Sequence, residues 1–169
     1  CKKFNPHAHL EALNKTPPKT NDGEFVAVGM NGDVAFASVG ELRAMINYCT
    51  KWSDRTFMMQ SKDPSCFIPY TIPDNLIIAT TIESDINHDV SKAPNTVDRF
   101  ESMRSLNCRK MITIEPILTF NMNRLFMMVH LINPEIVYIG YDSKNNNLPE
   151  PTINETRELI EQLRISGTD

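Results

Sequence analysis

Lys110-Met-Ile-Thr-Ile-Glu-Pro-Ile-Leu118 is the stretch that decides the fold of this chain. The run is apolar and rich in β-branched side chains, which is typical of a strand buried within a sheet. It stops abruptly at Glu115-Pro116, where the proline has no N–H to continue the ladder of backbone hydrogen bonds. The stretch therefore predicts a buried strand that carries a carboxylate at its end.

Four other runs share this design, with an apolar body and a polar end: Phe25 to Asp33, Thr56 to Lys62, Leu76 to Glu83 and Ile136 to Asp142. Between them, apolar residues at helical spacing predict helices from Ser38 to Trp52, from Asn95 or Thr96 to Leu106, from about Asn121 to Ile132, and from Ile153 to Ile165. Segment 66–75 is rich in turn residues and predicts an abbreviated crossover. Because crossovers between strands of one sheet are right-handed, this order predicts an α/β fold with five parallel strands.

The length and composition indicate one soluble domain over residues 1–169. The chain begins at Cys1 without a methionine and ends at Gly167-Thr-Asp169, where another strand is expected, so it looks truncated at both ends. A net charge of −4 gives no basic surface for phosphate tracking, which makes a long nucleic acid an unlikely partner. No apolar run is long enough to span a membrane and no signal segment opens the chain, so we expect a cytoplasmic protein without a membrane partner.

Polar side chains at the strand ends are the candidate site residues. The carboxyl ends of parallel strands meet at one edge of a sheet, so these groups are expected to converge there. A single carboxylate at a strand end is explained equally well by a helix cap or an ion pair, but the coincidence at four strand ends favours a binding site. Lys62 fits either a ligand oxygen or an ordinary ion pair. The candidates are Asn31, Gly32 and Asp33 after the first run, Lys62 after the second, and Glu83, Glu115 and Asp142 after the others.

Several kinds of chemistry are poorly supported. No histidine stands at a strand end, which argues against a metal-dependent hydrolase barrel. The chain has no Gly-x-Ser-x-Gly elbow, Walker loop or complete dinucleotide fingerprint. Cys49, Cys66 and Cys108 have no metal-site spacing and are predicted to be reduced thiols. His7 and His9 have a spacing that suits two metal ligands, but without a third ligand nearby they are interpreted as solvated loop residues.

The strand runs, taken in order, resemble the blocks of a phage- and prophage-associated family of unknown function that is similar to a branch of the radical S-adenosylmethionine superfamily. The resemblance covers nearly the whole chain. Its sharpest part is the succession Lys62-Asp-Pro64, Pro73-Asp-Asn75 and Ile114-Glu-Pro116.

This resemblance implies a partial TIM-like (βα)6 barrel whose first and last strands lie outside the chain. It further implies a Cys-x₃-Cys-x₂-Cys loop upstream, with Cys1 as its last cysteine, that binds a [4Fe-4S] cluster, and S-adenosylmethionine chelated at the fourth iron. By the same resemblance, Met30 to Asp33 would meet the methionyl amine, and Glu83, Glu115 and Asp142 would lie around ribose, adenine or substrate. The implied partners are a small-molecule or nucleotide substrate and a reductant such as flavodoxin or ferredoxin.

The chain departs from the family pattern, which leaves two alternatives open. Lys2 and Lys3 follow Cys1 where the family has an aromatic residue and alanine, and Gly140-Tyr141 replaces a glycine pair. The first alternative is a barrel remnant without a cluster that acts as a nucleotide- or protein-binding module. The second is an open doubly wound sheet that binds a nucleotide at its switch point, in which strand order would not follow chain order.

Overall fold

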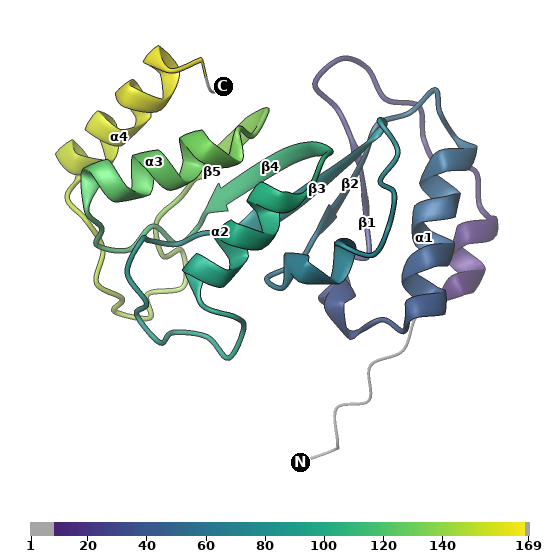
Figure 1. Ribbon diagram of the computed structural model, residues 1–169, viewed down its shortest axis with the longest axis horizontal. Helices are drawn as coiled ribbons and strands as arrows, with labels where there is room; N and C mark the ends of the chain where they lie inside the picture. The colour runs from purple at the N-terminus through teal and green to yellow at the C-terminus, as the bar shows by residue number, and fades with distance from the viewer. Residues whose placement is uncertain (1–8, 168–169) are drawn as a thin grey trace.

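The computed structural model describes residues 9–167 (Figure 1). Within these residues the chain forms five strands, four helices and three short 3₁₀ turns. The strands are β1 (Val26–Val28), β2 (Phe57–Gln60), β3 (Leu76–Thr81), β4 (Arg109–Ile114) and β5 (Ile136–Ile139). The helices are α1 (Val39–Lys51), α2 (Thr96–Ser105), α3 (Met122–Ile132) and α4 (Ile153–Ile165), and the 3₁₀ turns are η1 (Leu10–Asn14), η2 (Val34–Phe36) and η3 (Pro64–Phe67).

All neighbouring strands pair in parallel, and their spatial order β1-β2-β3-β4-β5 is the order of the chain. The predicted five-stranded parallel α/β fold is therefore confirmed. The order differs from that of a doubly wound sheet, in which the succession of strands reverses at the switch point. Within residues 9–167 the sheet is open, with β1 and β5 as its edges.

The strands are shorter than the apolar runs that predicted them. The first run was expected to be a strand that runs into a glycine-bearing turn before Asp33, and this is confirmed, since β1 ends at Val28 and Gly29 turns the backbone with a φ of +80°. A Cβ at position 29 would lie 2.4 Å from Val34 Cγ1, so only glycine fits this turn. The expectation that proline ends the fourth strand is confirmed, because β4 stops at Ile114, directly before Glu115-Pro116.

The helix starts follow the predicted capping residues. The Ser38 side chain accepts from the backbone N–H of Glu41, and Asn95 and Asn121 cap α2 and α3 in the same way. The helical spacing of apolar residues predicts Val97 and Ile153 on the inward faces of α2 and α4, and both predictions are wrong, since the two side chains are exposed. Each stands at its helix's start, outside the buried stripe, which includes Phe100 and Met103 in α2 and begins at Thr156 in α4.

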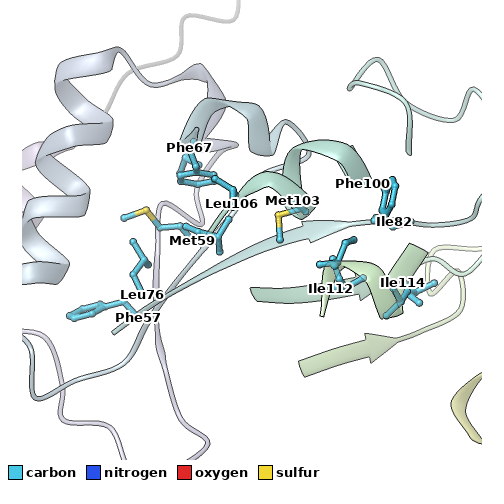
Figure 2. Packing of buried hydrophobic residues seen from close by; sticks show 14 of the residues in the cluster. Phe57, Met59, Phe67, Leu76, Ile82, Phe100, Met103, Leu106, Ile112 and Ile114 are labelled. Atoms are coloured by element: carbon cyan, nitrogen blue, oxygen red, sulfur yellow. The ribbon is translucent and has the colours of Figure 1, made fainter. Parts of the chain in front are cut away.

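Alternate residues of the strands face two different environments. Side chains such as Phe57, Met59, Leu76 and Ile112 pack with residues of the helices in the main core, part of which Figure 2 shows. The residues between them form a second, smaller cluster of Met58, Ile77, Ala79 and Met111, joined by Phe25 and Ile136. This cluster contains no helical residue, so its burial comes from neighbouring strands and the segment before β1. We call this side of the sheet the inner face.

Candidate functional site

Asp33 ties the loop after β1 to the end of β2. Its Oδ1 accepts from the backbone N–H of Ala35 at 3.0 Å and from the Ser61 hydroxyl at 2.5 Å, and its Oδ2 accepts from the backbone N–H of Lys62 at 2.9 Å. Both carboxylate oxygens of Asp33 therefore already accept hydrogen bonds from other residues of the chain. The neighbouring residues of the candidate site, Asn31 and Gly32, are exposed in the turn before it.

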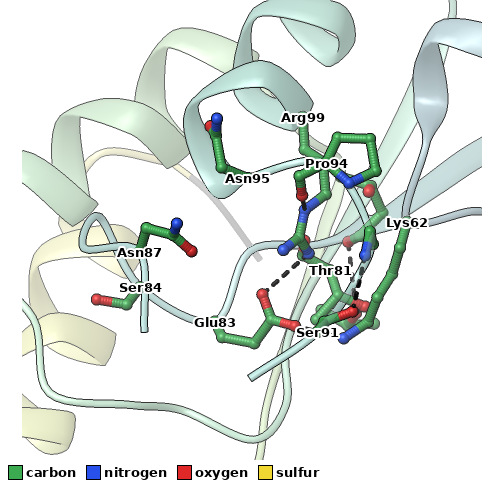
Figure 3. A network of polar contacts seen from close by, with 12 residues as sticks. Lys62, Thr81, Glu83, Ser84, Asn87, Ser91, Pro94, Asn95 and Arg99 are labelled. Carbon is green, nitrogen blue, oxygen red and sulfur yellow. Dashed lines mark hydrogen bonds and ion pairs between the residues drawn. The ribbon is translucent and has the colours of Figure 1, made fainter. Parts of the chain in front are cut away.

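Glu83, two residues after β3, is the most buried of the predicted site residues, with a relative exposure of 2 %. One oxygen contacts Lys62 Nζ, and the other accepts from Arg99 Nη1 at 2.9 Å (Figure 3). Arg99 also donates to the backbone carbonyls of Thr81 and Pro94, at 2.5 and 2.8 Å. A buried carboxylate is thus held between two cations, and Lys62 forms an ion pair, the simpler of its two interpretations.

Arg99 was missed by the sequence reasoning. It lies on α2, and it is buried next to Phe100 on the inward stripe of that helix. The only signal in the sequence was a basic residue within an apolar helical pattern, which usually indicates a side chain that reaches around to solvent.

The segment after β4 crosses the carboxyl ends of its two neighbouring strands. The backbone N–H of Leu118 donates to the carbonyl of Glu83 at 3.0 Å, and that of Ile117 donates to the carbonyl of Gly140 at 2.7 Å. This double attachment fixes the position of Glu115, whose side chain is exposed. Within residues 9–167 the Glu115 carboxylate has no hydrogen-bond or ion-pair partner. Glu115 is therefore the unpaired carboxylate of this edge of the sheet.

Asp142 has a local role in the loop after β5. Its carboxylate accepts from the backbone N–H of Lys144 at 3.0 Å, and also from the backbone and side-chain amides of Asn146. Slight burial raises the pKa of the Asp142 carboxyl, but these amide donors outweigh it, so that the pKa lies below its ordinary value. The structure thus brings Asp33, Lys62 and Glu83 into one network, attaches Glu115 beside it, and places Asp142 in a separate turn.

The three cysteines of the described residues lie on separate elements, and of these Cys66 lies near Ser61 and Asp33 at this edge. Cys49 faces the core from α1, Cys66 lies in η3, and Cys108 precedes β4. Burial raises the pKa of the Cys49 and Cys66 thiols to about 12. Among the described residues, no three His, Cys, Asp or Glu side chains are placed to hold a metal ion. Cys1, the predicted cluster ligand, and His7 lie outside the described residues.

Two hollows flank the sheet. A polar cavity of about 20 Å³, lined in part by Glu83, His88, Thr96 and Arg99, has space for about one water molecule. The buried Thr96 hydroxyl has no partner there. A larger, open hollow of about 590 Å³ lies at the opposite, amino ends of the strands, and its two arginines, Arg55 and Arg109, are already paired.

Comparison of the chain with models of protein families, with curated proteins and with solved structures finds no match in any of the three. Among the described residues, no helix has both the length and the apolar character needed to cross a membrane.

Proposed function

We propose that this chain is the barrel portion of a radical S-adenosylmethionine enzyme, and that the carboxyl edge of its sheet binds the cofactor. The observation that carries the proposal is the unpaired Glu115 carboxylate at the carboxyl ends of five parallel strands in chain order. Parallel α/β folds, both barrels and open sheets, bind their ligands at this edge.

The charge balance at the edge supports a cationic ligand. Within the network, the carboxylates of Asp33 and Glu83 are matched by the two cations Lys62 and Arg99. Glu115 adds a further carboxylate beside the network, and Asp63 and Asp85 lie at the same edge, so the edge carries more negative than positive groups. S-Adenosylmethionine has a sulfonium and an ammonium group against one carboxylate, so its net charge is positive. Glu115 is the residue that can bind the ammonium group, because the carboxylates of Asp33 and Glu83 are already occupied by the chain.

The described residues do not fit the [4Fe-4S] cluster. A cluster needs several thiolates at one place, whereas Cys49, Cys66 and Cys108 lie on separate elements, and burial raises the pKa of each thiol. Any cluster would need ligands outside residues 9–167. We therefore derive no electron-transfer step, and assign to this chain the binding and orientation of the cofactor.

The same observation favours a second candidate function. This candidate is a module that has no cluster and binds a nucleotide at the same edge. Such binding requires only the carboxyl edge of the sheet and the Glu115 carboxylate. The two candidates share the ligand site and differ in the metal, so they are separable by experiment.

The first experiment measures binding of S-adenosylmethionine to the full-length protein by calorimetry. Glu115→Gln keeps the size of the side chain and removes its charge, so we expect affinity to fall about tenfold or more. The matched control is Glu101→Gln, because Glu101 lies on the outer surface of α2 and pairs only with the exposed Arg104. Equal affinity of the Glu115 variant and the unmodified protein would overturn the proposed site.

The second experiment is anaerobic reconstitution of the full-length protein with iron and sulfide. The enzyme is expected to become brown and to give an electron paramagnetic resonance signal after reduction. A colourless protein that still binds S-adenosylmethionine through Glu115 would instead support the binding module.

A further inference from the structure

A row of polar side chains crosses the inner face near the carboxyl edge. Gln60 on β2, Thr81 on β3, Thr113 on β4 and Tyr138 on β5 occupy it, and we call these four residues the polar belt. Thr81 pairs in register with Thr113, and Thr113 with Tyr138. Gln60 joins the row through its side chain, whose amide nitrogen lies 3.3 Å from Thr81 Oγ1 and 3.2 Å from Thr113 Oγ1. The belt borders the apolar cluster of Met58, Ala79 and Met111.

The hydrogen bonds within the belt leave an acceptor free. The amide nitrogen of Gln60 is committed to the two threonine hydroxyls, and Thr113 Oγ1 in turn lies 2.9 Å from Thr81 Oγ1 and 3.3 Å from the carbonyl of Thr80. Both threonines are buried. Within residues 9–167 nothing donates to Gln60 Oε1. The belt therefore offers a carbonyl oxygen, and a ligand that pairs with it must present an N–H or O–H donor.

Tyr138 gives the belt a flat apolar surface. Its relative exposure is 52 %, although it stands on a strand beside the buried Thr113. Its neighbours Val137 and Ile139 pack into the main core, which leaves the Tyr138 ring on the inner face. The Tyr138 ring and the Gln60 amide lie on the same face of the sheet, and both are neighbours of Thr113. An aromatic ring and a free acceptor placed in this way suit a planar ring that carries an N–H donor, because stacking and one hydrogen bond can act together.

We propose that the polar belt binds an amino-substituted heteroaromatic ring, as in the base of a cytosine nucleoside, with Tyr138 against the face of the ring and Gln60 Oε1 accepting from its amino group. This inference goes beyond the proposed function, since it concerns a substrate base. Cytidine is the probe because the adenine of S-adenosylmethionine also carries an amino group, so only a base absent from the cofactor reports on the belt separately.

The test measures binding of cytidine to the full-length protein by calorimetry, with the cytidine analogue that lacks the 4-amino group as the matched probe. We expect the analogue to bind about tenfold more weakly. Tyr138→Ala should weaken cytidine binding by a similar factor, whereas Tyr138→Phe, which keeps the ring, should restore it. Gln60→Met removes the acceptor at nearly constant size and should abolish the preference for cytidine over its analogue. Leu131→Ala, an exposed position on α3, is the control that should change nothing.

The outcomes separate the two proposals. Equal affinity for cytidine and its analogue, or an unchanged affinity for cytidine in Tyr138→Ala, would overturn the polar belt as a base site. This conclusion would hold whether or not the protein binds S-adenosylmethionine. Conversely, cytidine binding that depends on Tyr138 in a protein that fails to bind S-adenosylmethionine would support the belt and reject the cofactor site. A cytidine-containing single strand is measured beside the free nucleoside, and the tighter of the two identifies the source of the base.

Discussion

Gly140 leaves space for the side chain of Glu115. A Cβ at position 140 would lie 3.1 Å from both Cγ and Cδ of Glu115, closer than ordinary van der Waals contact. Position 140 has no positive φ, so the limit on its side chain comes from this contact and not from the backbone. The glycine that follows β5 thus leaves room for the unpaired carboxylate in this position.

Gly140→Ala is expected to move the Glu115 side chain by a few tenths of an ångström and to lower the affinity for S-adenosylmethionine several-fold. The free energy of unfolding should stay level or rise by up to about 1 kcal/mol, since alanine restricts the unfolded chain. Calorimetry and urea unfolding measure the two effects. Gly40→Ala is the control, because a Cβ there meets no atom within 4 Å, and its affinity should not change. A Gly140 variant with full affinity would contradict the role of this contact.

Glu83→Gln is expected to destabilise the fold by about 3–5 kcal/mol, because it leaves the buried Arg99 guanidinium without its countercharge. The measurement is the free energy of unfolding in urea. Glu101→Gln, which removes only the exposed pair with Arg104, should cost less than about 1 kcal/mol. If the two variants were equally stable, Glu83 would not be the central residue of its network.

The parallel pairing of the strands could be predicted from the sequence, because right-handed crossovers between successive runs make the strands parallel. Their spatial order could not be predicted, since the sequence left open a doubly wound sheet, and it was the structure that gave β1-β2-β3-β4-β5. The starts of the helices at Ser38, Asn95 and Asn121 could also be predicted, since an N-cap depends only on residues within the first helical turn. The turn after β1 could be predicted as well, because Gly29 and Gly32 interrupt the apolar run.

The partners of the site residues could not be predicted, because they depend on contacts between distant segments. Glu83 meets Lys62 and Arg99 from two other elements, and neither pairing leaves a periodic signal in the sequence. For the same reason Asp33 and Asp142 looked equivalent to Glu115, although the first two are engaged by nearby backbone groups and Glu115 is not.

The segment Pro73-Asp-Asn75 joins two elements of the fold through the side chain of Asn75. The Asn75 side-chain amide donates to the carbonyls of Cys49, Trp52 and Arg55, at 3.0, 3.1 and 2.9 Å. It therefore fastens the end of α1 and the segment after it to the start of β3.

Asn75→Ala is expected to lower the free energy of unfolding by about 1–3 kcal/mol, because three carbonyls lose a donor at once. Urea unfolding measures the loss. Asn47→Ala, at an exposed position on α1, serves as the comparison and should stay within about 0.5 kcal/mol of the unmodified protein. A loss at position 75 no larger than that at position 47 would show that the three hydrogen bonds contribute nothing measurable.

Stability should fall in alkaline solution, partly because of Cys66. Burial raises the pKa of its thiol from an ordinary value of 9.0 to about 12, so the folded chain holds this proton more tightly than the unfolded chain. The resulting stabilisation is complete below pH 9 and is lost as the pH rises toward 12. Cys66→Ser removes the titrating group at similar size, so its free energy of unfolding should decline less steeply over this range than that of the unmodified protein. Urea unfolding at several pH values compares the two slopes, and parallel curves would mean that the thiol is as accessible to water in the folded chain as in the unfolded one.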